Sequence, residues 1–232
     1  PPVREFRGGY RFVASGAGVT ADLGLAAGVP ITLGPNNPVG ATSARVRGSA
    51  DLDPDLTATT RLADLRGARG LGVSLGTINF SFNGGPSASV DLTGADTIQN
   101  VADRLTAAIR QYETDNGVTV LGPGGVSVSG ESLSIDVPAG GALRFADIPA
   151  GVTARDLGLA AEAPFDFTSA TPTGVALDPT LTWTTPIAAL QGTGGPLGQI
   201  RVRSAGGSAV IDLSTATTLE DVRNQIEGTG LG

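Results

Sequence analysis

The feature of this 232-residue sequence that most constrains its fold is an internal repeat. Residues 150–161 repeat residues 17–27 at every position, except that the second copy contains one extra residue, Arg155. Two further pairs of similar segments follow: 52–67 with 177–192, and 90–93 with 211–214. Similar segments that recur in the same order indicate a chain built from copies of one structural unit.

The repeat divides the chain into three predicted segments. Residues 1–35 are expected to be the tail of a preceding repeat unit, residues 36–163 a complete unit, and residues 164–232 the head of a following unit. The first and last segments are complementary parts, so our hypothesis is that residues 1–35 pack with residues 164–232. Because the chain begins at Pro1 and contains no Met, we expect it to be a piece of a longer protein.

A hairpin and a helix are the clearest elements of one unit. Residues 77–82 and 87–92 alternate apolar and polar side chains around Asn83-Gly84-Gly85, which predicts two antiparallel strands and their turn. A helix capped by Thr97 or Asp96 should follow, with an apolar stripe made of Ile98, Val101, Leu105 and Ile109.

Shorter elements complete the unit. They are a helix at 61–66 capped by Thr60 and closed by Gly67, strands at 118–121, 126–129, 132–137 and 142–145, and one helical turn at 153–158. In the second copy, Thr185-Pro186 starts the short helix, residues 198–211 form the hairpin, and Thr217 with Glu220 forms a capping box. The expected fold class is α+β and strand-rich, with tandem modules of short strands and hairpins and one amphipathic helix each.

Composition excludes several functions. The chain has no Cys and no His, and all 15 of its basic residues are Arg. Thiolate and imidazole metal sites, His-based catalytic triads and Lys-based phosphate loops are therefore absent, and we expect no enzyme activity, no cofactor and no metal. A net charge of −7 argues against nucleic acid, and the lack of a long apolar run argues against a membrane span.

Two motifs superficially resemble ligand-binding loops. Asp51-x-Asp53-x-Asp55 suggests a calcium loop, but Leu occupies positions 56 and 62, where an EF-hand requires Gly and Glu. We therefore interpret Asp53-Pro54 as a turn. The glycines at 67, 70 and 72 suggest a nucleotide loop, but they follow a short helix and precede a strand, the reverse of a dinucleotide fingerprint.

Three other residues deserve comparison between the copies. Asp91 and Asp212 occupy the same position, at the end of the second hairpin strand, and we interpret both as turn carboxylates rather than hydrolytic acids. Trp183, the one Trp, stands where the other copy has Ala58. We favour a core or interface anchor for Trp183, and the alternative is an exposed residue that stacks on carbohydrate.

The repeated segments resemble a known motif. The run from Leu62 to Gly72, followed by a strand pair that ends in the segment from Val90 to Leu105, looks like the hook IN motif of flagellins and flagellar hook-associated proteins. The second copy, from Ile187 to Ile226, resembles it too. The Ala-x-Asp-Leu-Gly-Leu phrase is similar to the segment that closes such repeats in filament cap and junction proteins.

The resemblance implies a structural protein of the bacterial flagellum, secreted and extracellular, that serves motility. Since the coiled-coil termini of such subunits are not seen, it implies an outer, surface-projecting region whose partners are other flagellar subunits or further copies in a filament. The alternative is an extracellular adhesin-like repeat module that binds glycans or surfaces, with Trp183 as a contact residue.

Overall fold

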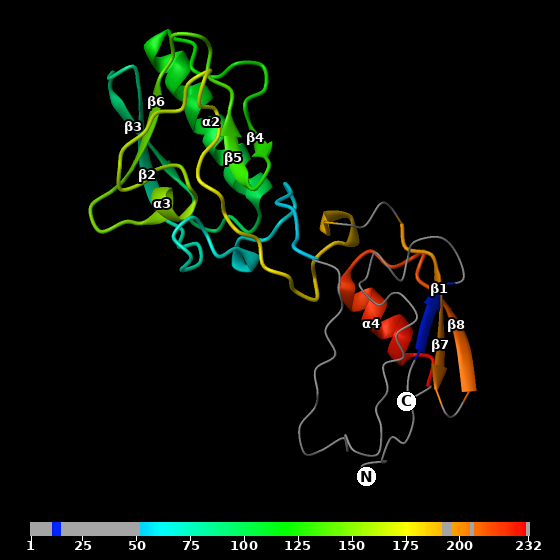
Figure 1. Ribbon diagram of the computed structural model, residues 1–232. Coiled ribbons are helices and arrows are strands. Elements are labelled where there is room, and N and C mark those ends of the chain that lie inside the picture. Colours follow the sequence, from blue (N-terminus) through cyan, green and yellow to red (C-terminus); the bar gives the residue numbers. More distant parts are fainter. Residues whose placement is uncertain (1–10, 15–51, 192–195, 205–206, 231–232) are drawn as a thin grey trace. The chain divides into compact units, whose positions relative to one another are not determined.

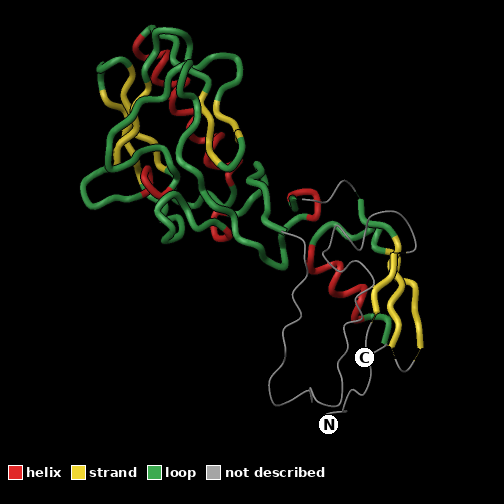
Figure 2. The backbone as a smooth tube through the Cα atoms, viewed as in Figure 1, coloured by secondary structure: helices red, strands yellow, loops and turns green. Residues whose placement is uncertain are grey.

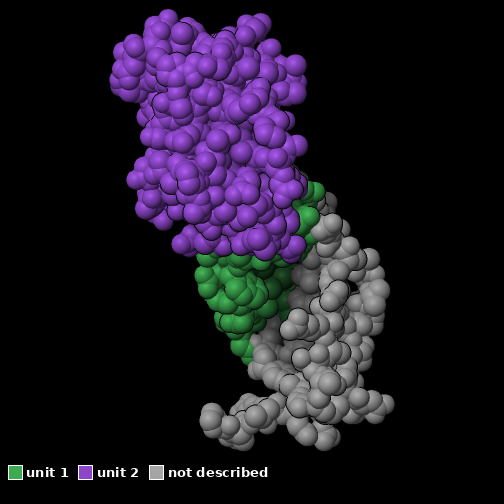
Figure 3. All heavy atoms as spheres, turned by 90° about the vertical axis from the view of Figure 1, so that its left-hand side faces the viewer, with its two compact units in different colours: residues 1–54, 181–232 green, residues 55–180 purple. Residues whose placement is uncertain are grey.

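A computed structural model describes residues 11–14, 52–191, 196–204 and 207–230. Short helices and strands alternate with loops and turns throughout these residues (Figures 1 and 2). Three small antiparallel sheets and three α-helices in this part of the chain make the fold mixed α+β, as predicted. The chain divides into two compact units (Figure 3): unit 1 is Pro1–Pro54 with Leu181–Gly232, and unit 2 is Asp55–Thr180. The predicted repeat bounds are bounds of sequence similarity and stay predictions.

Unit 2 contains a three-stranded sheet in the order β3-β2-β6. The predicted hairpin is confirmed, with β2 at Thr77–Phe82 and β3 at Ser87–Asp91 in antiparallel register. Asn83 and Gly84 turn the chain with φ of 49° and 70°, the left-handed region that Asn and Gly adopt most readily. Strand β6, Leu143–Asp147, pairs with the other side of β2 and places Phe145 opposite Phe80.

Helix α2, Ile98–Asn116, supplies most of the apolar cover for this sheet. Thr97 is its N-cap, and the Thr97 hydroxyl and the Asn100 side chain form a capping box. The predicted stripe is buried, and it is extended by Ala102 and Tyr112. The helix lies between the sheet and the hairpin of β4, Val126–Ser129, and β5, Ser132–Ile135 (Figure 1).

Aromatic rings link the elements of the unit 2 core. Phe80 packs against Tyr112 of α2 with ring centroids 5.5 Å apart, and Phe145 packs edge-on against Phe167 at 5.7 Å. Helix α3, Thr153–Asp156, adds Ala154 to this core, and all of these side chains are buried. The core therefore joins β2 to residues more than sixty positions later in the chain.

Unit 1 contains a sheet in the order β1-β7-β8. Strand β1, Arg11–Ala14, pairs antiparallel with β7, Gln199–Ser204, and β7 pairs with β8, Gly207–Asp212. The strand contributed by the beginning of the chain therefore lies beside a hairpin near its end. A smaller apolar core accompanies this sheet, and it includes Ile200, Ile211 and Leu213.

Helix α4, Leu219–Glu227, belongs to unit 1. Thr218 is its N-cap: the Thr218 hydroxyl accepts the Asp221 N–H, and the Asp221 carboxylate accepts the Thr218 N–H, which completes a capping box. The predicted box at Thr217 and Glu220 is wrong by one residue. Val222 is the buried member of the apolar stripe, while Leu219 and Ile226 are partly buried.

Several short elements also differ from prediction. The helix expected at 61–66 is a 3-10 turn, η1, at Leu62–Asp64, because Leu65 is extended and bridges to Pro179. The Thr60 hydroxyl accepts the Thr57 N–H instead of capping a helix. The corresponding turn of unit 1, η2, spans Ile187–Ala189, with Pro186 just before it. The strand expected at 118–121 does not form.

Candidate functional site

Trp183 lies on the surface of unit 1. Its side chain is 58% exposed, so Trp183 is not a core residue, while an interface anchor and a surface contact both stay predictions. The guanidinium carbon of Arg223, on α4, lies 4.9 Å from the centre of the indole ring, and Arg223 also donates to Glu220 at 2.7 Å. The exposed aromatic surface of Trp183 therefore has the positive charge of Arg223 beside it.

The glycine-rich loop at 67–72 uses its backbone for internal contacts. The Gly67 N–H donates to the Leu177 carbonyl, the Ala68 N–H to the Asp156 carbonyl, and the Gly72 N–H to the Arg66 carbonyl. A phosphate-binding loop instead directs such N–H groups at its ligand. The loop therefore connects η1 to distant parts of unit 2 and has the character of a structural loop.

Asp156 fixes this loop from within unit 2. Its side chain is 1% exposed and accepts hydrogen bonds from Arg69 Nε at 2.6 Å and from the Ser74 N–H at 3.0 Å. Arg69 itself is about one-third exposed, so its charge is partly hydrated while the carboxylate is not. A buried carboxylate needs such partners, because an unpaired charge in the interior is costly.

A second ion pair lies beside the first. Arg155 Nε donates to Asp147 at 2.8 Å, and the other Asp147 oxygen accepts the Ala154 N–H. The hydrogen bond to Asp147 raises the pKa of Arg155, and the charges of Asp147, Asp156 and Glu162 act in the same direction against desolvation. Arg155 is the extra residue of the second sequence copy, so the internal repeat had already singled it out.

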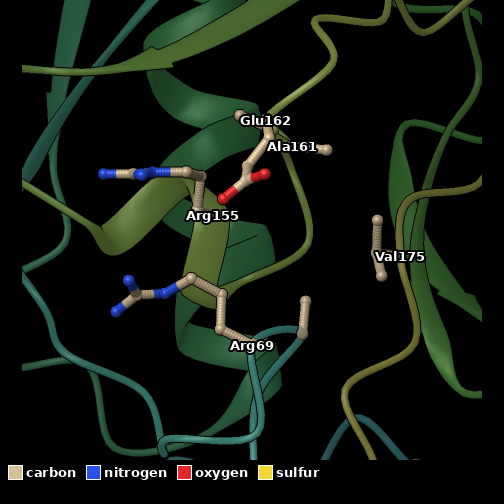
Figure 4. A pocket seen from close by; sticks show the side chains of 7 residues that line it. Arg69, Arg155, Ala161, Glu162 and Val175 are labelled. Atoms are coloured by element: carbon tan, nitrogen blue, oxygen red, sulfur yellow. The ribbon is translucent and has the colours of Figure 1, made fainter.

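These arginines line a pocket of about 360 Å³ in unit 2 (Figure 4). The other lining residues are mostly small and apolar: Ala68, Ala160, Ala161, Glu162 and Val175. Sequence reasoning missed this pocket, because its walls come from three separate segments of the chain, one of which includes Arg155 of α3. The extra Arg155 was the one available signal, and it pointed to a difference between the copies rather than to a cavity.

The paired carboxylates Asp91 and Asp212 act as turn residues. Asp91 accepts the Thr93 N–H and Asp212 accepts the Ser214 N–H, both at 2.9 Å. Hydrogen bonding to Thr93 lowers the pKa of Asp91, and hydrogen bonding to Ser214 lowers the pKa of Asp212. These hydrogen bonds favour the ionised form of both groups, in agreement with the interpretation as turn carboxylates.

The acidic motif at 51–55 falls partly outside the described residues, since Asp51 does. Within the part of the chain that the structure describes, no group of three or more His, Cys, Asp or Glu side chains is placed to hold a metal ion. In the same residues, no helix combines the length and the apolar character needed to cross a bilayer.

Comparison with protein-family models, with curated proteins and with solved structures finds no match for this chain. The resemblance to the hook IN motif of flagellar proteins therefore stays a prediction from the sequence.

Proposed function

We propose that the two units are copies of one module, in which a hairpin, a capped helix and a third strand form the framework. In unit 2, β6 pairs with β2 of the hairpin, and in unit 1, β1 pairs with β7. The repeat aligns Phe145 of β6 with Phe12 of β1, and each lies opposite the fourth residue of its hairpin strand, Phe80 or Val202. This correspondence of register supports the proposal, because an unrelated strand has no reason to adopt it.

The cap of the helix supports it further. Thr97 and Thr218 are both N-caps with a reciprocal partner three residues later, Asn100 or Asp221. The turn carboxylate before each helix, Asp91 or Asp212, accepts the N–H two residues on. Local devices that recur together at one spacing indicate a duplicated unit more strongly than any one of them alone.

We propose that this module is a structural, surface-projecting region of a bacterial flagellar filament or hook-associated subunit. The observation that carries the proposal is the hairpin and capped helix built by the residues that resemble the hook IN motif. Its role is mechanical: packed strands and helices present a stable surface outside the cell. Its partners are other flagellar subunits or further copies of the same chain.

Localisation tests this proposal directly. Antibody raised against residues 55–180 is applied to whole cells of the source organism and followed by immunogold electron microscopy. We expect gold along the flagella and recovery of the protein in sheared filaments. Gold confined to the cell body, with none in the sheared fraction, would contradict the flagellar role.

The alternative is an adhesin-like module that binds glycans, and the observation that favours it is the exposure of Trp183. An indole ring that is 58% exposed offers a face on which a sugar ring can stack. A glycan array distinguishes the two functions. Saturable binding that is lost in Trp183→Ala and kept in Leu71→Ala, a change at another exposed apolar residue, would favour the adhesin. The absence of binding by the unaltered chain favours the structural role.

A further inference from the structure

We propose that the pocket of unit 2 binds an organic cation, an alkylammonium or alkylguanidinium group on a short aliphatic stem. The volume of about 360 Å³ falls within the range of small-molecule sites. The inference does not depend on the proposed flagellar role, because it concerns the chemistry of one cavity within one unit.

The charged groups around the pocket differ in whether they already have an ion-pair partner. Arg69 is paired with Asp156 and Arg155 with Asp147, so each guanidinium already has a carboxylate at 2.6 to 2.8 Å. Glu162 is exposed and has no hydrogen-bond or ion-pair partner among the described residues. Glu162 also acts on Arg155 through its charge, but two arginines against three carboxylates leave one net negative charge in and around the pocket, which favours a positive ligand.

The orientation of the side chains agrees with this assignment. Figure 4 shows the guanidinium groups of Arg69 and Arg155 directed away from Val175, while the Glu162 carboxylate lies between Arg155 and Val175. The pocket is therefore bordered by the aliphatic stems of the arginines rather than by their charged ends. Long charged side chains commonly present such apolar stems while their heads contact water or partners.

The remaining walls suit an aliphatic stem. Ala68, Ala160 and Ala161 contribute methyl groups, and Val175, which is 38% exposed, forms the opposite side. A short alkyl chain buries apolar surface against these groups while its cationic end pairs with Glu162. The arrangement combines apolar walls with one orienting polar group, as small-molecule sites generally do.

The site also belongs to unit 2 specifically. Arg155 is absent from the corresponding segment, residues 17–27, of the other sequence copy. Asp147, its partner, aligns with Ala14 when Phe145 is aligned with Phe12. Arg155, which lines the pocket, and its partner Asp147 therefore occur in one copy only, whereas a purely structural feature of the module would recur in both.

Methyl resonances of the whole chain report on binding. Agmatine, which carries an ammonium and a guanidinium on a four-carbon stem, and n-butylamine are titrated against isotopically labelled protein. We expect saturable shifts at Ala68, Ala161 and Val175, and none with n-butanol, which matches the stem without the charge. Equal shifts with n-butanol, or shifts produced by acetate or phosphate instead, would overturn the assignment.

Two variants with the same change in charge isolate Glu162. Glu162→Gln should weaken agmatine binding by about fivefold, since a partly exposed ion pair is modest in strength. Glu131→Gln, at an exposed residue outside the pocket, should leave the affinity unchanged. Equal affinities for the two variants would sink the proposal. Both variants are surface changes, so both are expected to fold.

A further experiment distinguishes between two natural sources of the cation. If an arginine of a second copy of the chain fills the pocket, the same methyl shifts will appear on raising the protein concentration alone, and Glu162→Gln will abolish them. If a free amine fills it, the shifts will be independent of protein concentration and will need the added ligand. Either pattern supports an organic cation. If raising the protein concentration and adding agmatine both leave the methyl resonances unchanged, the proposal is rejected.

Discussion

At the scale of single residues, two carboxylates organise their surroundings by different means. Asp156 is buried in unit 2 and holds a loop through Arg69 and the Ser74 N–H. Asp221 is at the surface of unit 1 and holds the first turn of α4 through the N–H groups of Thr217 and Thr218. The first contribution depends on burial and the second on ionisation, so different perturbations reveal them.

Replacing Asp156 by Asn should destabilise unit 2 by about 2 to 3 kcal/mol. The amide cannot keep both the charged bond to Arg69 and the acceptor for Ser74 in a site that is 1% exposed. The loss is smaller than for a fully buried pair, because water partly solvates Arg69. Urea unfolding followed by circular dichroism measures the change.

Asp178→Asn is the matched control for that change. The Arg66–Asp178 pair is 3.5 Å apart with both side chains more than half exposed, so its loss should change stability by less than about 0.5 kcal/mol. Asn also accepts the φ of 47° at this position. A loss at Asp178 as large as that at Asp156 would show that burial is not what makes Asp156 important.

The pH dependence of unit 1 should contain a contribution from Asp221. Hydrogen bonds from the Thr217 N–H, and then from the Thr217 hydroxyl and Thr218, lower the pKa of Asp221 from 3.8 to about 2. Because the folded pKa is the lower one, the stabilisation is present above pH 3.8 and is lost as the pH falls through about 2. Trp183 fluorescence follows this loss, since the Trp183 carbonyl accepts the Glu220 N–H of α4.

Asp221→Asn separates this contribution from that of other carboxylates. Asn100 performs the same capping role in α2, so an Asn at 221 should preserve the helix. We expect the variant to show a flatter fluorescence profile than the unaltered chain between about pH 4 and pH 2. Identical profiles for the two proteins would mean that Asp221 is not held ionised by its cap.

Predictions for single residues were confirmed where the hydrogen-bond partner is a near neighbour in the sequence. The turn carboxylates Asp91 and Asp212 accept N–H groups two residues away, and the cap at Thr97 accepts one three residues away. The sequence left Trp183 between a core and an interface position, because exposure depends on packing between distant segments. The same limit hid the pocket, whose lining runs from Ala68 to Val175.

At the scale of elements, the glycine loop at 67–72 contains a pair of residues that separates backbone strain from steric contact. Gly67 and Gly70 both have φ of +71°. A Cβ at Gly67 would lie 2.7 Å from the Gly72 carbonyl oxygen, whereas a Cβ at Gly70 would meet nothing within 4 Å. The two positions therefore require the same backbone conformation, but a Cβ has space at Gly70 and not at Gly67.

Gly70→Ala should destabilise unit 2 by about 1 to 2 kcal/mol, the usual cost of a left-handed L-residue. Gly67→Ala should cost roughly 3 kcal/mol or more, because the contact with a carbonyl oxygen is added to that strain. Parallel urea unfolding curves measure both losses. Similar losses at the two positions would indicate that the loop moves to relieve the contact.

Element prediction depended on where the backbone hydrogen bonds go. Strands β2 and β3 followed the alternation around Asn83, because a hairpin satisfies its own backbone locally. The segment at 118–121 has strand-like composition, yet the Val120 and Leu121 N–H groups both donate to the Glu113 carboxylate on α2. A helix side chain thus replaces the sheet partner, which periodicity alone does not reveal.

At the scale of the whole molecule, the two units differ in how the chain builds them. Unit 2 is continuous, and its apolar core from Leu56 to Leu177 lies wholly within residues 55–180. The sheet of unit 1 combines β1 from the beginning of the chain with β7 and β8 near the end. The internal repeat suggested this complementarity, but sequence similarity by itself gives no pairing or register.

Because of this difference, we expect unit 2 to fold without the rest of the chain and the C-terminal part of unit 1 not to. A chain of residues 55–180 should fold alone with cooperative unfolding, because it retains its whole core and sheet. A chain of residues 181–232 should not fold, because β7 loses the β1 edge and a two-stranded hairpin is marginal in water. Circular dichroism of both pieces, with Trp183 fluorescence for the second, measures the outcome.

Adding a peptide of residues 1–35 should restore structure to 181–232, and a scrambled peptide should not. Cooperative folding of 181–232 alone would contradict the role of β1, since the hairpin and α4 would then suffice.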